Sequence, residues 1–242
     1  MKVFVTGTGG YIGTVLAPVL IERGHEVTGF DTGFYHDGWL FHGVDRLPRA
    51  AVGDIRDITT EDLQGFDAVV HMAELSNDPL GQLNPEITFK INHQASVALA
   101  KAANEAGVRR FVYMSSCSVY GLGEDDYRTE ESDLDPQTAY AQCKVLVERD
   151  VSAMADDDFS PTFLRNATAF GASPRMRFDL VLNNLAGLAW TIREIRMTSD
   201  GQPWRPLVHI RDIAEAIACV LDSPREAVHN EVFNVGSTDQ NY

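Results

Sequence analysis

The sequence predicts an α/β protein: a doubly wound parallel sheet with a smaller C-terminal lobe. Two observations predict the sheet. Short runs rich in β-branched and aromatic residues recur along the chain, and longer helix-forming segments that end in glycine lie between them. Strands that alternate with such helices need right-handed crossovers, which set the strands parallel and cover both faces of the sheet. A third observation predicts the lobe, because polar loops with proline replace this pattern beyond about residue 165.

The expected strands are short and apolar enough to be buried in a parallel sheet. They are KVFVTG, EVTGFD, AVVHMA, RRFVYMSS and PTFLRN, at residues 2–7, 26–31, 68–73, 109–116 and 161–166. Helices are expected between them at 14–25 and 87–107. We expect residues 1–164 to form the first domain and residues 165–242 to form a lobe around a helix at 180–192. A helix and a strand at about 207–236 are expected to return to the first domain.

Composition limits the possible partners. The chain has 242 residues, of which 44% are hydrophobic, enough for one full core with a lobe attached. Its formal net charge of −15 argues against nucleic acid or an anionic membrane as a partner, since its field would repel both. The N-terminus has no apolar run long enough for a signal peptide or membrane span, so a cytoplasmic location is expected.

The positions of the cysteines argue against disulfides and metal sites, and the positions of the arginines favour a local contact with an anion. Cys117, Cys143 and Cys219 are scattered without metal-ligand spacing, so neither a disulfide framework nor a metal site is expected. Local positive charge is possible in the C-terminal part, where several arginines could meet an anionic ligand. They are Arg165, Arg175, Arg177, Arg205 and Arg211.

The segment after the first strand predicts a phosphate-binding loop. Gly7, Gly10 and Gly13 enclose Tyr11 and Ile12, and a helix follows directly. Glycines are needed where the backbone turns tightly, approaches a pyrophosphate or packs helix against strand. The free amides of the helix N-terminus would then face the phosphates. The spacing alone is weak evidence, since glycine-rich turns are common, and the flanking strand and helix strengthen it.

The second expected strand ends in Asp31, where a dinucleotide fold places a carboxylate on the adenosine ribose. A carboxylate there would repel a ribose phosphate, which favours NAD over NADP. The alternative is that Asp31 only caps the loop.

Tyr140 and Lys144 stand four residues apart in a helical segment and would project from one face. A tyrosine becomes a base only when a cation stabilises its phenolate, and Lys144 together with the oxidised nicotinamide would supply that charge. Ser116 lies at the end of a strand, where its hydroxyl could orient a substrate oxygen. Each residue also has an ordinary structural reading, as an exposed helix pair or a turn residue, so the combination carries the hypothesis.

Together these segments resemble the extended short-chain dehydrogenase/reductase family, specifically its NAD-dependent epimerase/dehydratase members. The motifs occur in one order along essentially the whole chain: TGTGGYIG, Asp31, GDIRD, VVHMAE, INHQAS, SSCSVYG, YAQCK and NVGS. The resemblance implies that residues 1–164 form an NAD-binding Rossmann domain and that residues 165–242 form a partial substrate-binding lobe. It also implies a nucleotide-diphosphate sugar as substrate, and a homodimer.

The resemblance implies roles for particular residues. Ser116, Tyr140 and Lys144 would be catalytic. The cofactor would contact Gly7, Gly10, Tyr11, Ile12, Gly13, Asp31, Asp54, Ile55, Ala73, Asn92, Ser115, Tyr140 and Lys144. The substrate would contact Ser118, Thr168, Asn184 and Arg205. Turn, packing and helix hydrogen-bonding roles remain open for Asp54, Ala73 and Asn92. Arg175 and Arg177 would add to the diphosphate contact or be solvated, and Trp39 would cover the cofactor or pack its own loop.

Two departures from the family pattern affect the reaction expected. Dehydratases and decarboxylases of the family usually carry an acidic residue two before the VYG tyrosine, and here that position is Ser118, preceded by Cys117. We therefore expect a 4-epimerase rather than a dehydratase or reductase. A 4-epimerase needs only the tyrosine base and a keto intermediate that can rotate in the site. Thr168 stands where many epimerases have asparagine, so sugar contacts near the nicotinamide cannot be transferred.

Family members usually continue past NVGS, so the resemblance predicts that a C-terminal segment is missing from this chain. A non-catalytic NAD-binding sensor is the alternative of a different class, since fold does not determine function.

Overall fold

The structure, a computed structural model, describes residues 1–42, 48–76, 81, 83–122, 127–197, 200 and 204–236. Its main sheet has seven parallel strands in the order β3-β2-β1-β4-β5-β6-β9, which confirms the predicted fold class. The strands are β1 (Lys2–Thr6), β2 (Glu26–Asp31), β3 (Arg49–Val52), β4 (Ala68–His71), β5 (Arg110–Ser116), β6 (Ser160–Asn166) and β9 (Glu231–Val235).

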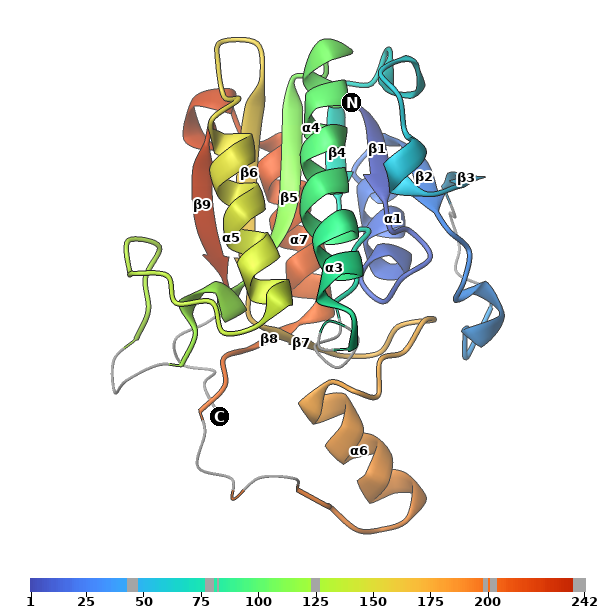
Figure 1. Cartoon of the computed structure of the whole chain (residues 1–242). Helices are drawn as coiled ribbons and strands as arrows, with labels where there is room; N and C mark the ends of the chain where they lie inside the picture. Colours follow the sequence, from blue (N-terminus) through green and yellow to red (C-terminus); the bar gives the residue numbers. More distant parts are fainter. Residues whose placement is uncertain are drawn as a thin grey trace.

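Helices cover both faces of this sheet (Figure 1). One face packs against α1 (Gly13–Glu22) and α7 (Ile210–Asp222), and their apolar side chains form one core with β1, β4 and β5. The other face packs against α4 (Ser96–Glu105) and α5 (Ala139–Ser152), which form the second core. The near-continuous apolar strands follow from this two-sided burial.

The segment expected as one helix at 87–107 consists of three parts. A short helix, α3 (Pro85–Thr88), runs into a π-helical stretch at Phe89–Ala95 and then into α4. Asn92 lies in the π-helical stretch, and its side chain bonds both backbone groups of Leu75, at 2.8 Å each. Such π-helical turns are frequent at functional sites, and here the turn ties the helix to the loop after β4.

Three strands were not predicted. All four residues of β3 are exposed, so the segment lacks the apolar pattern of a buried strand. The others, β7 (Thr168–Phe170) and β8 (Leu207–His209), form a separate two-stranded parallel sheet and are only three residues long. Beyond them α6 (Val181–Thr191) stands below the carboxyl ends of the main strands in Figure 1, apart from the sheet.

A buried ion pair joins α5 to β6. Arg165 donates to Glu148 at 2.7 Å, and the two side chains are only 5% and 8% exposed. Arg165 was expected among the arginines that could meet an anionic ligand, and the structure corrects this, because its guanidinium is used inside the core. Glu148 also accepts a hydrogen bond from Ser115, which lies on β5. The pair therefore connects α5 to two neighbouring strands.

We expect the Arg165→Met variant to lose about 3–5 kcal/mol of unfolding free energy, because it leaves the Glu148 carboxylate buried without its partner. Urea unfolding followed by circular dichroism measures the loss. The matched control is Arg23→Met, which breaks an exposed pair with Asp222 and should cost much less. Equal losses in the two variants would contradict the structural role of the buried pair.

Candidate active site

The glycine-rich loop lies at the switch point of the sheet, between β1 and β4. The chain proceeds from β1 to β2 and β3 on one side and from β4 onward on the other, so the loops after β1 and β4 diverge at this point. Gly7 has a φ of +80°, and a Cβ there would lie 3.0 Å from the Ala73 nitrogen. A Cβ on Gly13 would lie 2.2 Å from the Gly7 carbonyl oxygen. Both positions thus require glycine, as the sequence predicted for a loop that approaches a pyrophosphate.

Asp31 ends β2 and holds this loop from the side. Its carboxylate accepts hydrogen bonds from the backbone nitrogens of Gly9 at 2.9 Å and Gly33 at 2.8 Å. Trp39 donates its indole N–H to the Gly9 carbonyl at 3.2 Å, so the segment after β2 packs directly on the glycine loop. Helix α1 begins after Ile12, where no side chain caps the first turn. These features fit a dinucleotide: a glycine cradle, a helix N-terminus and a carboxylate at the ribose position.

The other predicted cofactor residues surround the same edge of the sheet. Asp54 accepts from the backbone and the guanidinium of Arg56, which lowers the pKa of its carboxyl group. Ile55 is buried beside it. The Ala73 nitrogen bonds the Thr6 hydroxyl at 3.2 Å, directly beside Gly7. Asp54 and Ala73 thus have structural partners of their own, which does not conflict with a place beside a cofactor.

The three predicted catalytic residues come from two neighbouring elements. Ser116 is the last residue of β5, while Tyr140 and Lys144 lie one turn apart on α5, which begins at the cap formed by Thr138. The Lys144 Nζ lies 5.2 Å from the centroid of the Tyr140 ring. The Ser116 hydroxyl lies close enough to Tyr140 to contribute to lowering the pKa of its phenol. The structure therefore brings together the hydroxyl, the phenol and the cation that were expected to act as one set.

The electrostatics of Tyr140 keep its proton in place. Burial raises the pKa of the Tyr140 hydroxyl, the Lys144 ammonium opposes this, and the nearby Glu74 carboxylate raises it further. The pKa stays above its ordinary value, so Tyr140 is a neutral phenol near pH 7 in the chain by itself.

The predicted substrate residues are less closely grouped. Ser118 follows β5, and its buried hydroxyl has no hydrogen-bond partner among the described residues. Thr168 begins β7, and Asn184 on α6 donates to the Phe178 carbonyl at 3.0 Å. Arg205 is exposed and is one of the charged groups acting on Cys117.

Glu74 was not assigned a role from the sequence, whereas Arg175 and Arg177 were expected to add to the diphosphate contact or to be solvated. Arg177 donates to the Ser76 hydroxyl at 2.9 Å and to Asp179, and its charge acts on Tyr140. Arg175 lies with its guanidinium 4.3 Å from the centroid of the Tyr35 ring. Glu74, directly after the loop residue Ala73, turns its side chain inward and pairs with Lys144. The signal for Glu74 was its place at a strand end, next to a predicted cofactor residue.

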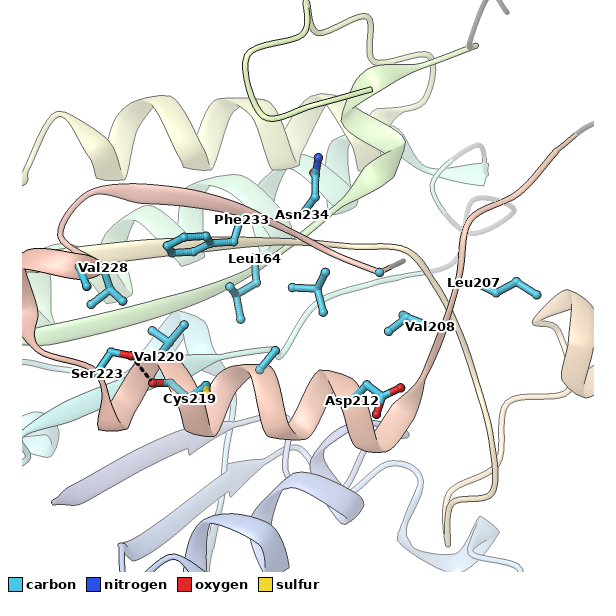
Figure 2. A pocket seen from close by; sticks show the side chains of 14 residues that line it. Leu164, Leu207, Val208, Asp212, Cys219, Val220, Ser223, Val228, Phe233 and Asn234 are labelled. Carbon is cyan, nitrogen blue, oxygen red and sulfur yellow. Dashed lines mark hydrogen bonds between the residues drawn. The ribbon is translucent and has the colours of Figure 1, made fainter. Parts of the chain in front are cut away.

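A cavity of about 620 Å³ lies elsewhere, between α7 and the strands β6 and β9 (Figure 2). Its apolar wall is formed by Leu164, Val208, Val220, Val228 and Phe233. The described residues that line it include neither the glycine loop nor the catalytic set, so this cavity is distinct from the candidate active site.

Two further observations concern the described residues as a whole. No helix among them has the length and apolar character needed to cross a membrane. They also contain no group of three or more histidine, cysteine and acidic side chains placed to hold a metal ion.

A parallel sheet with a glycine loop at its switch point is the class of fold that binds dinucleotides. Within that class, the chain belongs to the NAD dependent epimerase/dehydratase family, because the sequence model of that family matches residues 3–236. This confirms the resemblance inferred from the motifs and NAD as the cofactor of the family.

Known relatives share most of their length with this chain. The UDP-glucose 4-epimerase of Corynebacterium glutamicum is 31% identical over 257 residues, covering 99% of this chain and 76% of that protein. The structure of a UDP-glucose 4-epimerase from Stenotrophomonas maltophila, with bound NAD, is 27% identical with a TM-score of 0.84 and covers 100% of this chain and 79% of that one. The dTDP-glucose 4,6-dehydratase DesIV from Streptomyces venezuelae, also with NAD, is 26% identical with a TM-score of 0.86, covering 98% and 76%.

We expect Gly13→Ala to weaken NAD binding by about tenfold or more, since the new methyl group displaces the Gly7 carbonyl and with it the loop. The unfolding free energy should fall by about 1–3 kcal/mol. Calorimetric titration with NAD measures the first effect and urea unfolding the second. Gly38→Ala is the control, because nothing lies within 4 Å of a Cβ there. Unchanged NAD affinity in Gly13→Ala would remove the loop from the cofactor site.

His71 predicts a specific acid sensitivity. Burial, with a contribution from Lys144, lowers the pKa of this imidazole to about 3, whereas an unfolded histidine titrates near pH ~6.5. Between these two pKa values the unfolded chain binds one more proton than the folded chain. The contribution of the neutral His71 ring to the unfolding free energy is therefore fully present above pH ~6.5 and is lost as the pH falls towards about 3. The loss is about 1.4 kcal/mol per pH unit. In His71→Gln the slope of unfolding free energy against pH should be smaller by this amount; an identical slope would contradict the buried neutral imidazole.

Proposed function

We propose that the chain is an NAD-dependent nucleotide-sugar epimerase that inverts C4 through a transient keto sugar. The observation that carries the proposal is the grouping of Ser116, Tyr140 and Lys144 at the carboxyl ends of the strands, beside the glycine loop. Family membership and the similarity to UDP-glucose 4-epimerases support it.

In this proposal Tyr140 removes the proton of the sugar hydroxyl, and Ser116 holds the same oxygen. Lys144 stabilises the phenolate that Tyr140 must form, since its ammonium group lowers the pKa of the phenol. When bound, NAD supplies the hydride acceptor, and the return of hydride to the opposite face gives the epimer. Once the keto sugar has rotated in the site to present its opposite face, Tyr140 returns the proton to the oxygen.

The residues after Ser116 favour epimerisation over dehydration. Elimination of water needs an acid whose pKa lies near the working pH. Burial raises the pKa of the Cys117 thiol to about 11, with Arg205 opposing, so this thiol donates a proton poorly. Ser118 carries no carboxyl group. Neither residue supplies the acid that must protonate a departing hydroxyl in elimination, whereas epimerisation expels no hydroxyl and needs only the proton that Tyr140 removes and returns.

The substrate residues are proposed from the same geometry. Arg205 and Asn184 would hold the diphosphate of the nucleotide sugar, with Arg175 and Arg177 on the neighbouring loop. A guanidinium matches phosphate oxygens in a bidentate way, which suits this role.

Proton NMR of uridine- and thymidine-linked hexoses and hexuronates, incubated with the protein and catalytic NAD, tests the proposal. A new anomeric signal without accumulation of NADH supports an epimerase and identifies the sugar. A keto sugar instead would establish a dehydratase, and stoichiometric NADH a net oxidation. Tight NAD binding without turnover of any member of the panel would count against catalysis and for the sensor.

We expect Tyr140→Phe to lower kcat by about 10²–10⁴-fold, because phenylalanine has no hydroxyl group that could take the proton of the sugar hydroxyl. NAD affinity should change little, since the loop and α1 are untouched. The matched control is Tyr127→Phe, a tyrosine that is 70% exposed. Steady-state rates on the substrate found by NMR measure the effect, and an unchanged kcat would rule out Tyr140 as the base.

A further inference from the structure

Glu74 stands in the loop after β4, and its side chain is buried against the proposed catalytic lysine. The Glu74 Oε2 pairs with the Lys144 Nζ, and the two side chains are 3% and 4% exposed. The Tyr113 hydroxyl donates to the other carboxylate oxygen, at 2.6 Å. Lys144 also donates to the Met114 carbonyl and lies 4.6 Å from the centroid of the Tyr113 ring. The ammonium group is therefore held on several sides by β4 and β5.

A chain of hydrogen bonds runs from the backbone of the loop after β4 through Thr6 and His71 to Ser96. The Thr6 Oγ1 accepts from the backbone nitrogens of Met72 and Ala73, at 3.1 and 3.2 Å. Both lone pairs of the hydroxyl are then used, so its proton goes to the His71 Nδ1, 2.7 Å away.

The neutral His71 ring then carries its proton on Nε2. That nitrogen lies 2.7 Å from the Ser96 Oγ and donates to it. Ser96 lies close enough to Glu74 to contribute to lowering the pKa of its carboxyl group. Burial raises the pKa of the Glu74 carboxyl group above its ordinary value, while the contacts with Lys144 and Tyr113 oppose this and favour the ionised carboxylate.

We propose that Glu74 is a positioning residue: its carboxylate keeps Lys144 protonated and holds the ammonium beneath Tyr140. The inference deepens the proposed function, on which it rests for the role of Tyr140 as base. The contact between Glu74 and Lys144 does not itself depend on that reaction.

The charge balance around Lys144 supports this assignment. Burial by itself lowers the pKa of the Lys144 amine, while Glu74, then Tyr140 and Glu148, raise it, so that the pKa lies above its ordinary value. Among the described residues, the other titratable groups that interact with the pair are His71 from β4, Tyr113 from β5 and Cys143 from α5. Arg177, from the loop beyond β7, acts on Tyr140. His71 is neutral near pH 7, and Arg177 carries positive charge. Glu74 is thus the anion in direct contact with the ammonium.

Lysine NMR of the cofactor-free protein tests the proposal. The chain contains four lysines, Lys2, Lys90, Lys101 and Lys144, so the ε-carbon signals of ¹³C-labelled lysine are few, and Lys144→Met assigns the one of interest. In the wild type we expect Lys144 to titrate at higher pH than the other three. In Glu74→Gln its midpoint should fall by at least about one pH unit, because burial remains and the anion is gone.

The matched control is Glu86→Gln, which removes a carboxylate from the exposed pair of Glu86 and Lys90. Glu86→Gln should shift the titration midpoint of Lys90 far less than Glu74→Gln shifts that of Lys144, since solvent screens an exposed pair. A Lys144 midpoint in folded Glu74→Gln equal to that of the wild type would overturn the proposal. A wild-type midpoint below those of the other three lysines would also overturn it, and this outcome requires no variant that folds.

The activity of the variant gives a second readout. Glu74→Gln should lose kcat, with KM little changed, most strongly at the pH where its Lys144 has lost the proton. Glu74→Asp, which restores the charge on a shorter side chain, should recover part of the loss. Because the lysine titration uses neither NAD nor substrate, it can succeed even if the epimerase assignment fails, and the two failures remain distinguishable.

Discussion

The arrangement of the candidate site depends on the cost of burying charge. Helix α5 carries Lys144 and Glu148 one turn apart, and both side chains are almost fully removed from water. An ion taken out of water costs several kcal/mol unless a partner of opposite charge lies against it. The partners come from different places: Glu74 from the loop after β4 and Arg165 from β6. These two pairs hold α5 across the sheet and place Tyr140 beside the end of β5.

Much of the fold could be predicted because buried strands and helices have recognisable patterns of apolar residues in the sequence. The strands β1, β4 and β5 contain continuous apolar runs. At the start of α1, Gly7 and Gly13 have backbone atoms where a Cβ would lie. The exposed edge strand β3 has no such pattern. The same holds for β7 and β8, which pair over three residues each and are stabilised by neighbours distant in sequence. Local pattern cannot report interactions of that kind.

The candidate site shows the same division. The glycine loop and the tyrosine and lysine four apart are local patterns, so their residues could be named in advance. Glu74 is part of the motif VVHMAE that identified the family, but only the folded chain shows that its carboxylate pairs with Lys144. Likewise, Arg165 could be read as a ligand for an anion until β6 placed it against Glu148. Charged residues are ambiguous in a sequence because their partners are chosen by tertiary structure.

The buried pair at Lys144 has two opposed effects on the proposed base. The Glu74 carboxylate secures the ammonium that Tyr140 needs, yet the same negative charge raises the pKa of the Tyr140 phenol. Burial is the largest cause that raises the pKa of this phenol, and Lys144 and Arg177 together do not offset it, since the pKa remains above its ordinary value. Proton removal by Tyr140 therefore requires positive charge beyond what the described residues supply. A site built in this way keeps its tyrosine protonated in the chain alone and becomes basic only in a complex that brings a further cation to the phenol.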